Sequence, residues 1–290
     1  MSAVRLPPVL CVAVLAWPAA CARGASTDGV PLPAPPALDA PARDAGIDPL
    51  PEPLPSAAPT ASPDAGAAPS GRCPDDMAFV DGDYCPGLER TCLRPRKSWQ
   101  CAEWAPALAC PGATERKRYC IDRYEWPNRE GALATVMNSW HDARKLCASA
   151  GKRLCTEAEW TLACEGPERL GFPYGEVRDA DACPIDKISP IVNEERLFSP
   201  ATRDAELARL DQREPSGARP RCVSPYGVHD LTGNVDEWVD NETGQPFKGS
   251  LKGGNWGEYR NACRPVTRGH AEGFRYYQTG FRCCRAPLAD

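Results

Sequence analysis

The chain has 290 residues, of which 42% are hydrophobic, and it contains 8 tryptophans, so it is long and apolar enough to form a globular core. Its formal net charge is -5 and it has no run of lysine or arginine, which argues against nucleic acid as a partner. Its 16 cysteines are too many to remain free thiols. Because no CxxC spacing occurs between Cys73 and Cys284 and only 3 histidines are present, disulfides explain the cysteines better than zinc does.

Residues 1–21 have the pattern of a secretory signal peptide. Arg5 precedes an apolar stretch, residues 9–17, that is too short to span a bilayer. Cys21 follows Pro18 and two alanines, which is similar to a bacterial lipobox, although leucine is usual where Pro18 stands. We therefore expect an exported protein that is periplasmic, an outer-membrane lipoprotein or extracellular. Lipidation of Cys21 and plain secretion are the two alternatives.

Residues 22–71 form a segment rich in proline, alanine, aspartate and serine with almost no aromatic residues. Such a composition cannot bury enough apolar surface to offset the entropy lost on ordering, and its prolines favour extended conformations. The segment is predicted to be a disordered tether. If Cys21 is lipidated, the tether would hold the following domain away from the membrane surface.

The remaining chain, from Cys73 onward, contains 14 cysteines, an even number as complete pairing requires. Residues 73–120 carry six of them with little periodicity, which predicts loops stapled by disulfides whose connectivity the sequence leaves open. Ser139 and Thr156 are predicted to cap two helices that end near Gly151 and Gly166. The rest, including residues 168–221, is predicted to form short strands and long loops.

Six segments in order resemble successive signatures of the formylglycine-generating-enzyme (sulfatase-modifying factor) family. They are YCIDRYE at 119–125, SW at 139–140 with DA at 142–143, GKRL at 151–154 with TEAEW at 156–160, YGVHDLTGNV at 226–235 with EW at 237–238, KGGNW at 252–256 and GFRC at 280–283. The resemblance covers residues 77–287. It implies a single compact α+β domain with little regular secondary structure, related in topology to C-type lectins.

The resemblance also implies a structural calcium site. Asp230 and Glu237 match positions that supply carboxylate oxygens in the family, and Gly233 and Val235 match positions that supply backbone carbonyls. Carboxylates and carbonyls are the ligands that calcium prefers. The alternative is that Asp230 and Glu237 only stabilise a turn.

Two disulfides follow from the resemblance, and a third is expected between the two cysteines that it leaves over. Cys147 and Cys283 match two positions that are bridged in family members. Cys164 matches a position whose partner precedes the GFR motif, where this chain offers only Cys263. Two cysteines without family counterparts, Cys155 and Cys284, are expected to pair with each other.

The family's enzymes oxidise a cysteine of a client sulfatase to formylglycine and bind copper(I) through two thiolates that follow a GGS segment. Here the matching stretch is GGNWGEYRNACR, residues 253–264, in which Cys263 is the only candidate and Glu258 stands five residues before it. Either Glu258 replaces the first catalytic cysteine, or both are missing and Cys263 is structural. A carboxylate is a hard ligand that suits copper(I) poorly, so the resemblance predicts no copper and no oxidase activity. A divergent copper-dependent oxidase is the alternative.

Without oxidase chemistry, the fold would serve as a binding or envelope-structural module. Aromatic and arginine side chains near the C-terminus are predicted to line a groove for a peptide or a glycan. The groove residues are Asn255, Trp256, Arg260, Arg264, Arg268, Phe274, Tyr276 and Tyr277. The membrane would be contacted only through an N-terminal lipid.

Overall fold

The computed structural model describes residues 72–97, 99–107 and 109–289. The predicted signal peptide, the lipidation of Cys21 and the tether at residues 22–71 lie outside the described residues. Among the described residues, no helix is long and apolar enough to cross a membrane.

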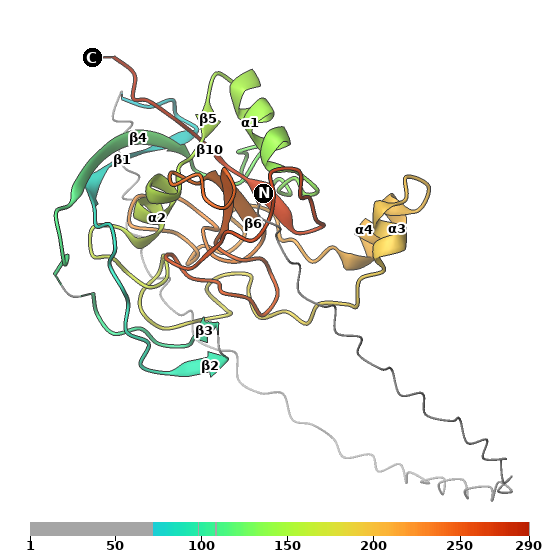
Figure 1. Ribbon diagram of the computed structural model, residues 1–290, viewed down its shortest axis with the longest axis horizontal. Helices are drawn as coiled ribbons and strands as arrows, with labels where there is room; N and C mark the ends of the chain where they lie inside the picture. The colour runs from blue at the N-terminus through green and yellow to red at the C-terminus, as the bar shows by residue number, and fades with distance from the viewer. Residues whose placement is uncertain (1–71, 98, 108, 290) are drawn as a thin grey trace, which may run out of the picture. The chain divides into compact units, whose positions relative to one another are not determined.

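The first sheet has the strand order β1-β4-β10-β5. Its long antiparallel pair is formed by β1 (Met77–Tyr84) and β4 (Glu115–Asp122), which run side by side as curved ribbons in Figure 1. The short strands β10 (Cys283–Arg285) and β5 (Arg153–Leu154) extend it. Between β1 and β4, a hairpin is formed by β2 (Pro95–Lys97) and β3 (Gln100–Cys101).

The second sheet has the order β8-β7-β6-β9. The buried strand β6 (Asp236–Asp240) pairs antiparallel with β7 (Gly249–Lys252) and parallel with β9 (Thr279–Phe281). The edge strand β8 (Val266–Thr267) pairs with β7. This sheet brings the EW, KGGNW and GFRC segments together, although more than 40 residues separate the first from the last.

Both predicted helices form with the predicted caps. The helix α1 (Trp140–Ser149) begins with a capping box between Ser139 and Asp142, and α2 (Glu157–Glu165) begins with one between Thr156 and Glu159. Each cap satisfies backbone amides that the first turn leaves without partners.

The prediction that residues 168–221 contain no helix is wrong. The structure forms α3 (Glu194–Phe198) and α4 (Arg203–Leu210), which lie against each other in Figure 1. These helices escaped detection because α3 is only five residues long and α4 buries only Glu206 and Leu210, so the apolar pattern is weak.

The core contains three tryptophans that are fully buried, Trp160, Trp238 and Trp256. Trp160 lies in one hydrophobic cluster, together with residues of both sheets. Trp238 lies in a second cluster with residues of α1. Trp256 packs in a third cluster with Leu197 of α3 and Leu210 of α4. Trp238 and Trp256 are thus core residues, which contradicts the prediction that Trp256 lines a ligand groove.

All 14 cysteines of the described residues are paired. Cys147 is bonded to Cys283, Cys164 to Cys263 and Cys155 to Cys284, which are the three pairs expected from the sequence. The cysteines whose pairing was left open form three nested bridges and a fourth: Cys73–Cys120, Cys85–Cys110, Cys92–Cys101 and Cys183–Cys222.

Candidate functional site

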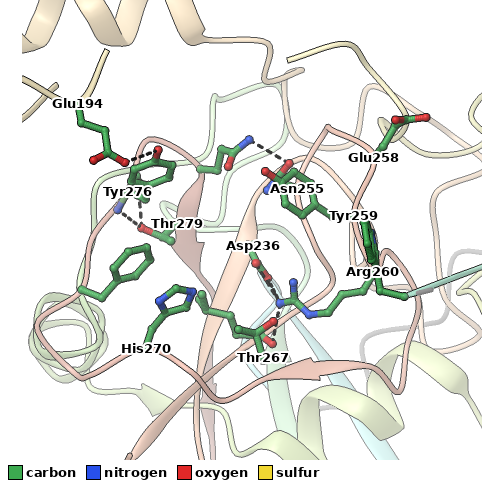
Figure 2. Close-up of a pocket in the computed structure, with 14 residues that line it drawn as sticks. Glu194, Asp236, Asn255, Glu258, Tyr259, Arg260, Thr267, His270, Tyr276 and Thr279 are labelled. Carbon is green, nitrogen blue, oxygen red and sulfur yellow. Dashed lines mark hydrogen bonds and ion pairs between the residues drawn. The ribbon is translucent and has the colours of Figure 1, made fainter. Parts of the chain in front are cut away.

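A pocket of about 710 Å³ opens beside the loop that follows β7. Figure 2 shows Glu194 and Tyr276 at one end of it, Glu258 and Tyr259 at another, and Asp236 between them. Of the predicted groove residues, four line the pocket: Asn255, Arg260, Phe274 and Tyr276.

The pocket has aromatic walls. Phe274 stacks between His270 and Tyr276, with ring centroids 3.9 Å and 5.9 Å away. Burial lowers the pKa of His270, which favours the neutral imidazole. Trp99, at the turn of the β2–β3 hairpin, adds an indole that is 58% exposed. Stacked rings with exposed edges and an accessible indole can bury apolar or planar groups of a ligand.

The floor of the pocket is an ion pair. The Arg260 guanidinium donates to both carboxylate oxygens of Asp236 at 2.9 Å and 3.0 Å and to the carbonyl of Leu251. Burial raises the pKa of Asp236, although Arg260 opposes the shift. Because each group neutralises the other, this pair offers a ligand little net charge.

The other four predicted groove residues do not line this pocket, so the groove prediction is wrong for them. Trp256 and Tyr277 are buried and pack against each other. The Nε and Nη2 atoms of Arg264 donate to the two carboxylate oxygens of Glu165 in α2, each at 2.7 Å. Arg268 pairs with Glu157 at the start of the same helix. The sequence reveals which residues are aromatic or basic, but not which of them are buried or paired within the protein.

The loop between β7 and β8 is held tightly at its glycines and at Cys263. Gly253 and Gly254 have φ of +85° and +67°, and a Cβ on Gly253 would lie 2.7 Å from the carbonyl oxygen of Leu231. Only glycine adopts such a conformation at no steric cost. Beyond these glycines, Cys263 is bonded to Cys164, which fixes the end of the loop to α2.

Glu258, five residues before Cys263, lies on the pocket rim. Its carboxylate pairs with Lys97, and a second oxygen lies 3.6 Å from Arg96 of the hairpin. Its side chain is partly exposed and engaged in surface ion pairs, which contribute little to stability. The carboxylate therefore connects the pocket loop to the hairpin that carries Trp99.

The predicted calcium residues lie in a buried, highly charged region. Both oxygens of Glu237 accept hydrogen bonds at 2.7 Å from Arg282, and one also accepts from the Trp160 indole. Burial raises the pKa of Asp230 to about 6, and burial together with Asp230 and Glu237 raises the pKa of Glu125 well above its usual range. Three carboxylates thus share one guanidinium.

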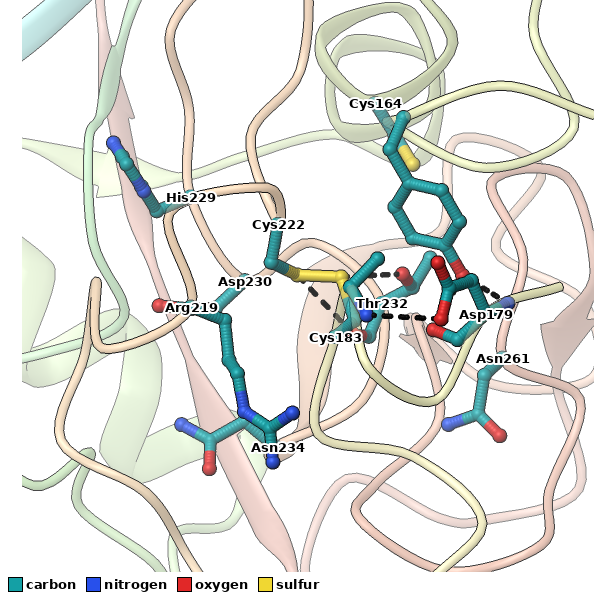
Figure 3. Close-up of a disulfide and its surroundings, with 12 residues drawn as sticks. Cys164, Asp179, Cys183, Arg219, Cys222, His229, Asp230, Thr232, Asn234 and Asn261 are labelled. Atoms are coloured by element: carbon teal, nitrogen blue, oxygen red, sulfur yellow. Dashed lines mark hydrogen bonds between the residues drawn. A yellow bond between two sulfur atoms is a disulfide. The ribbon is translucent and has the colours of Figure 1, made fainter. Parts of the chain in front are cut away.

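The turn that carries these residues is braced by a disulfide. Figure 3 shows Cys183–Cys222 beside Thr232, whose hydroxyl donates to the Cys183 sulfur, with Asp230 and Asn234 on the same turn. Asp230 has a φ of +58° and accepts from the Gly217 amide at 2.7 Å. Among the described residues, no group of three or more His, Cys, Asp or Glu side chains has the arrangement of a metal site. Calcium at Asp230, Gly233, Val235 and Glu237 stays a prediction.

Residues 103–287 match the family described as the sulfatase-modifying factor enzyme 1-like domain. The chain belongs to this family. The matched range is more than half of the chain, and it contains the pocket loop, the buried carboxylates and both capped helices. The predicted family, and the predicted single α+β domain with little regular secondary structure and many disulfides, are confirmed.

Two curated relatives in this family illustrate its range. The inactive C-alpha-formylglycine-generating enzyme 2 of Bos taurus is 31% identical over 161 residues, which are 50% of this chain and 48% of that protein. The formylglycine-generating enzyme of Bos taurus is 32% identical over 134 residues, which are 39% of this chain and 31% of that protein. The chain therefore spans half or less of these relatives.

The solved structures that resemble the chain are more distant in sequence. The crystal structure of CarF shares 16% identity, covers 73% of this chain and 98% of its own, and gives a TM-score of 0.46. PvdO from Pseudomonas aeruginosa shares 18% identity, covers 72% and 94%, and gives a TM-score of 0.44.

In this sulfatase-modifying-factor domain, sequence reasoning missed several pocket residues. Trp99 stands some 160 residues from Tyr259. Long-range contacts bring the two together: Gln100 donates to the Tyr259 carbonyl, and Lys97 and Arg96 pair with Glu258. Glu194 belongs to a helix that was not predicted. A weak signal existed for α3, since Asn193 is followed by two glutamates, as at many helix starts.

Proposed function

We propose that this sulfatase-modifying-factor domain has no oxidase activity and acts as a binding protein in an exported, oxidising environment. The observation that carries the proposal is the bond between Cys263 and Cys164. A copper(I) centre of the family type needs two unpaired thiolates, and Cys263 is the only cysteine in the loop that follows the paired glycines. With its sulfur in a disulfide, the loop offers none.

The position of Glu258 supports the same proposal. Its carboxylate is a hard ligand, and it is already paired with Lys97 and Arg96 on the hairpin. An alignment that places Glu258 at the first catalytic position therefore leaves that position without sulfur.

The export part of the proposal rests on the sulfur chemistry and the N-terminal sequence. Seven disulfides in one domain are typical of secreted, periplasmic or cell-surface proteins, because the cytosol keeps thiols reduced. Mass spectrometry of the mature N-terminus would test signal cleavage and lipidation at Cys21 together.

Thiol titration of the folded, unreduced domain tests the loss of oxidase chemistry. We expect no thiol among Cys73 to Cys284 to react and no tight copper(I) binding. The Cys164→Ser variant is the matched control, since it frees Cys263 and should add one slowly reacting, buried thiol. Two reactive thiols and tight copper binding in the wild-type domain would overturn the proposal.

The alternative, a divergent oxidase, is favoured by one finding. The relative named as a formylglycine-generating enzyme is as similar to this chain, at 32%, as the relative named as inactive, at 31%. Conversion of cysteine to formylglycine in a sulfatase-derived peptide, measured by mass spectrometry with copper present, would establish this alternative.

We propose the aromatic pocket as the ligand site, with a peptide or a glycan as the ligand. Trp99→Ala tests the site, because this side chain is exposed and its removal leaves the core intact. The variant should bind members of peptide and glycan arrays at least about tenfold more weakly than the wild-type domain does. Equal binding by both proteins would place the ligand elsewhere.

A further inference from the structure

Two isoleucines on the segment before α3 are exposed to an unusual degree. Ile188 and Ile191 each have 91% of their surface accessible, more than any other large hydrophobic side chain of the described residues. One exposed apolar residue needs no explanation, but several close together indicate a contact surface. We name Ile188 and Ile191 the isoleucine ridge.

The ridge stands in the chain between two segments that reach the pocket. Just before it, the Lys187 amide donates to the Trp256 carbonyl at 2.8 Å, and the Asp186 amide donates to the Gly257 carbonyl. Just after it, Glu194 lines the pocket itself. The ridge therefore connects the loop that carries Glu258 with the helix that carries Glu194. Glu258 and Glu194 both line the pocket.

The backbone of the ridge is held in place. Gln212 donates to the carbonyl of Ile188 at 2.9 Å, and Arg209 donates to the carbonyl of Ile191 at 2.6 Å. Both donors belong to or directly follow α4. Since the carbonyls are fixed toward α4, the two side chains are presented outward by a braced segment, which lowers the entropy lost when a partner covers them.

Glu194 is the carboxylate of the pocket without a cationic partner. Asp236 pairs with Arg260, and Glu258 pairs with Lys97. Glu194 forms no ion pair with any residue that the structure describes and accepts only the Tyr276 hydroxyl, at 3.3 Å. A basic group entering beside Tyr276 would meet both this charge and the face of an aromatic ring.

The chemistry of this surface favours a polypeptide over a glycan. Sugars bind through many hydrogen bonds, yet the Asn255 side-chain oxygen is already engaged within the protein, where it accepts from Gln278 and from Gly257. Exposed isoleucines gain free energy only when apolar groups cover them and remove their surface from water. Apolar side chains of another protein meet that need, and sugar hydroxyls do not.

We propose that the isoleucine ridge and the pocket together bind an extended segment of another protein. Its apolar side chains cover Ile188 and Ile191, and one lysine or arginine pairs with Glu194. This inference rests on the proposed binding function and adds the class of partner and the residues that select it.

A display library of short random-sequence peptides, selected on the wild-type domain, tests the inference. The selected peptides should be enriched in apolar residues together with one lysine or arginine. The Ile188→Ser/Ile191→Ser double variant should bind them at least about tenfold more weakly. Glu194→Gln should weaken by a few-fold only those peptides that carry the basic residue. Leu133→Ser, at an exposed leucine outside the pocket, is the matched control and should bind like the wild type.

Four outcomes would overturn the inference. If Trp99→Ala abolishes peptide binding and the ridge variants do not, the pocket binds its ligand without the ridge, and only the proposed function survives. Binding to glycans alone, unchanged in the ridge double variant, leads to the same conclusion. A wild-type dimer in solution that the double variant converts to a monomer would identify a second copy as the partner. If neither peptides nor glycans bind, the proposed function fails as well.

Discussion

Lys252 is a fully buried amine whose charge the fold barely compensates. Its Nζ donates to the Arg264 carbonyl at 3.0 Å and lies 5.2 Å from the centre of the Trp160 ring. Burial lowers the pKa of Lys252 to about 7. Of the charged groups around it, Glu157 and Glu165 oppose the shift, while Arg260 and Arg264 reinforce it. A group with a lowered folded pKa binds its proton more tightly in the unfolded chain.

The free energy of unfolding should therefore rise between pH 7 and pH 9. In this window unfolding takes up a proton at Lys252, because the unfolded amine titrates near 10.5 and the folded one near 7. The contribution approaches about 1.4 kcal/mol per pH unit. Lys252→Met, measured by denaturant unfolding with the disulfides intact, should remove most of this slope. The exposed Lys248→Met variant should keep it, and a slope that both variants share would show that another group is responsible.

Helix α2 anchors the site from the inside of the molecule. It carries Cys164, which is bonded to Cys263, and Glu165, which pairs with Arg264 on the pocket loop. Its first turn depends on Thr156, whose hydroxyl accepts from the Glu159 amide at 3.2 Å, while Glu159 accepts from the Thr156 amide at 2.9 Å. The position of the pocket loop thus depends on a helix that starts at one threonine.

Thr156→Ala should lower the free energy of unfolding by about 1 kcal/mol, within the usual range of about 0.5 to 2 for a lost N-cap. Thermal unfolding of the disulfide-intact protein measures the change. Thr202→Ala is the control, because Thr202 stands at the N-cap of α4 but its side chain makes no capping bond. That variant should change the free energy by less than about 0.5 kcal/mol. Equal losses in both variants would refute the role of the cap.

The sequence predicts those parts of the fold whose cause is local. The caps of α1 and α2 are determined within four residues, so the sequence is sufficient to locate them. The parallel pairing of β6 with β9 joins Trp238 to Phe281 across more than 40 residues, and no local pattern encodes it. The pocket also depends on long-range contacts, since Trp99, Glu194 and Tyr259 come together only after these contacts form.

The disulfide framework links the stability of the domain to the bonded state of the Cys263 sulfur. Adjacent cysteines Cys283 and Cys284 tie β10 to α1 and to the segment before α2, closing loops of 136 and 129 residues. Such long loops contribute about 3 to 5 kcal/mol each in the chain-entropy account. Cys263 belongs to the same framework. A reductant strong enough to free the Cys263 thiol would also act on the bonds that hold the domain together, so freeing this thiol by reduction should destabilise the domain.

The calcium prediction concerns the charge balance of the whole core. Glu125, Asp230 and Glu237 bring three buried carboxylates to a single guanidinium, that of Arg282. A bound cation would offset the excess negative charge, and a ligand that binds only the native state must stabilise it.

A calcium chelator should therefore lower the melting temperature of the disulfide-intact domain, and added calcium should restore it more fully than magnesium does, because magnesium demands stricter octahedral geometry. Asp230→Asn removes one of the two proposed carboxylate ligands without a large change in volume, so its melting temperature should respond less to the chelator than that of the wild type. A melting temperature that the chelator leaves unchanged in the wild type would show that Arg282 alone balances these carboxylates, and that Asp230 and Glu237 serve the turn rather than a metal.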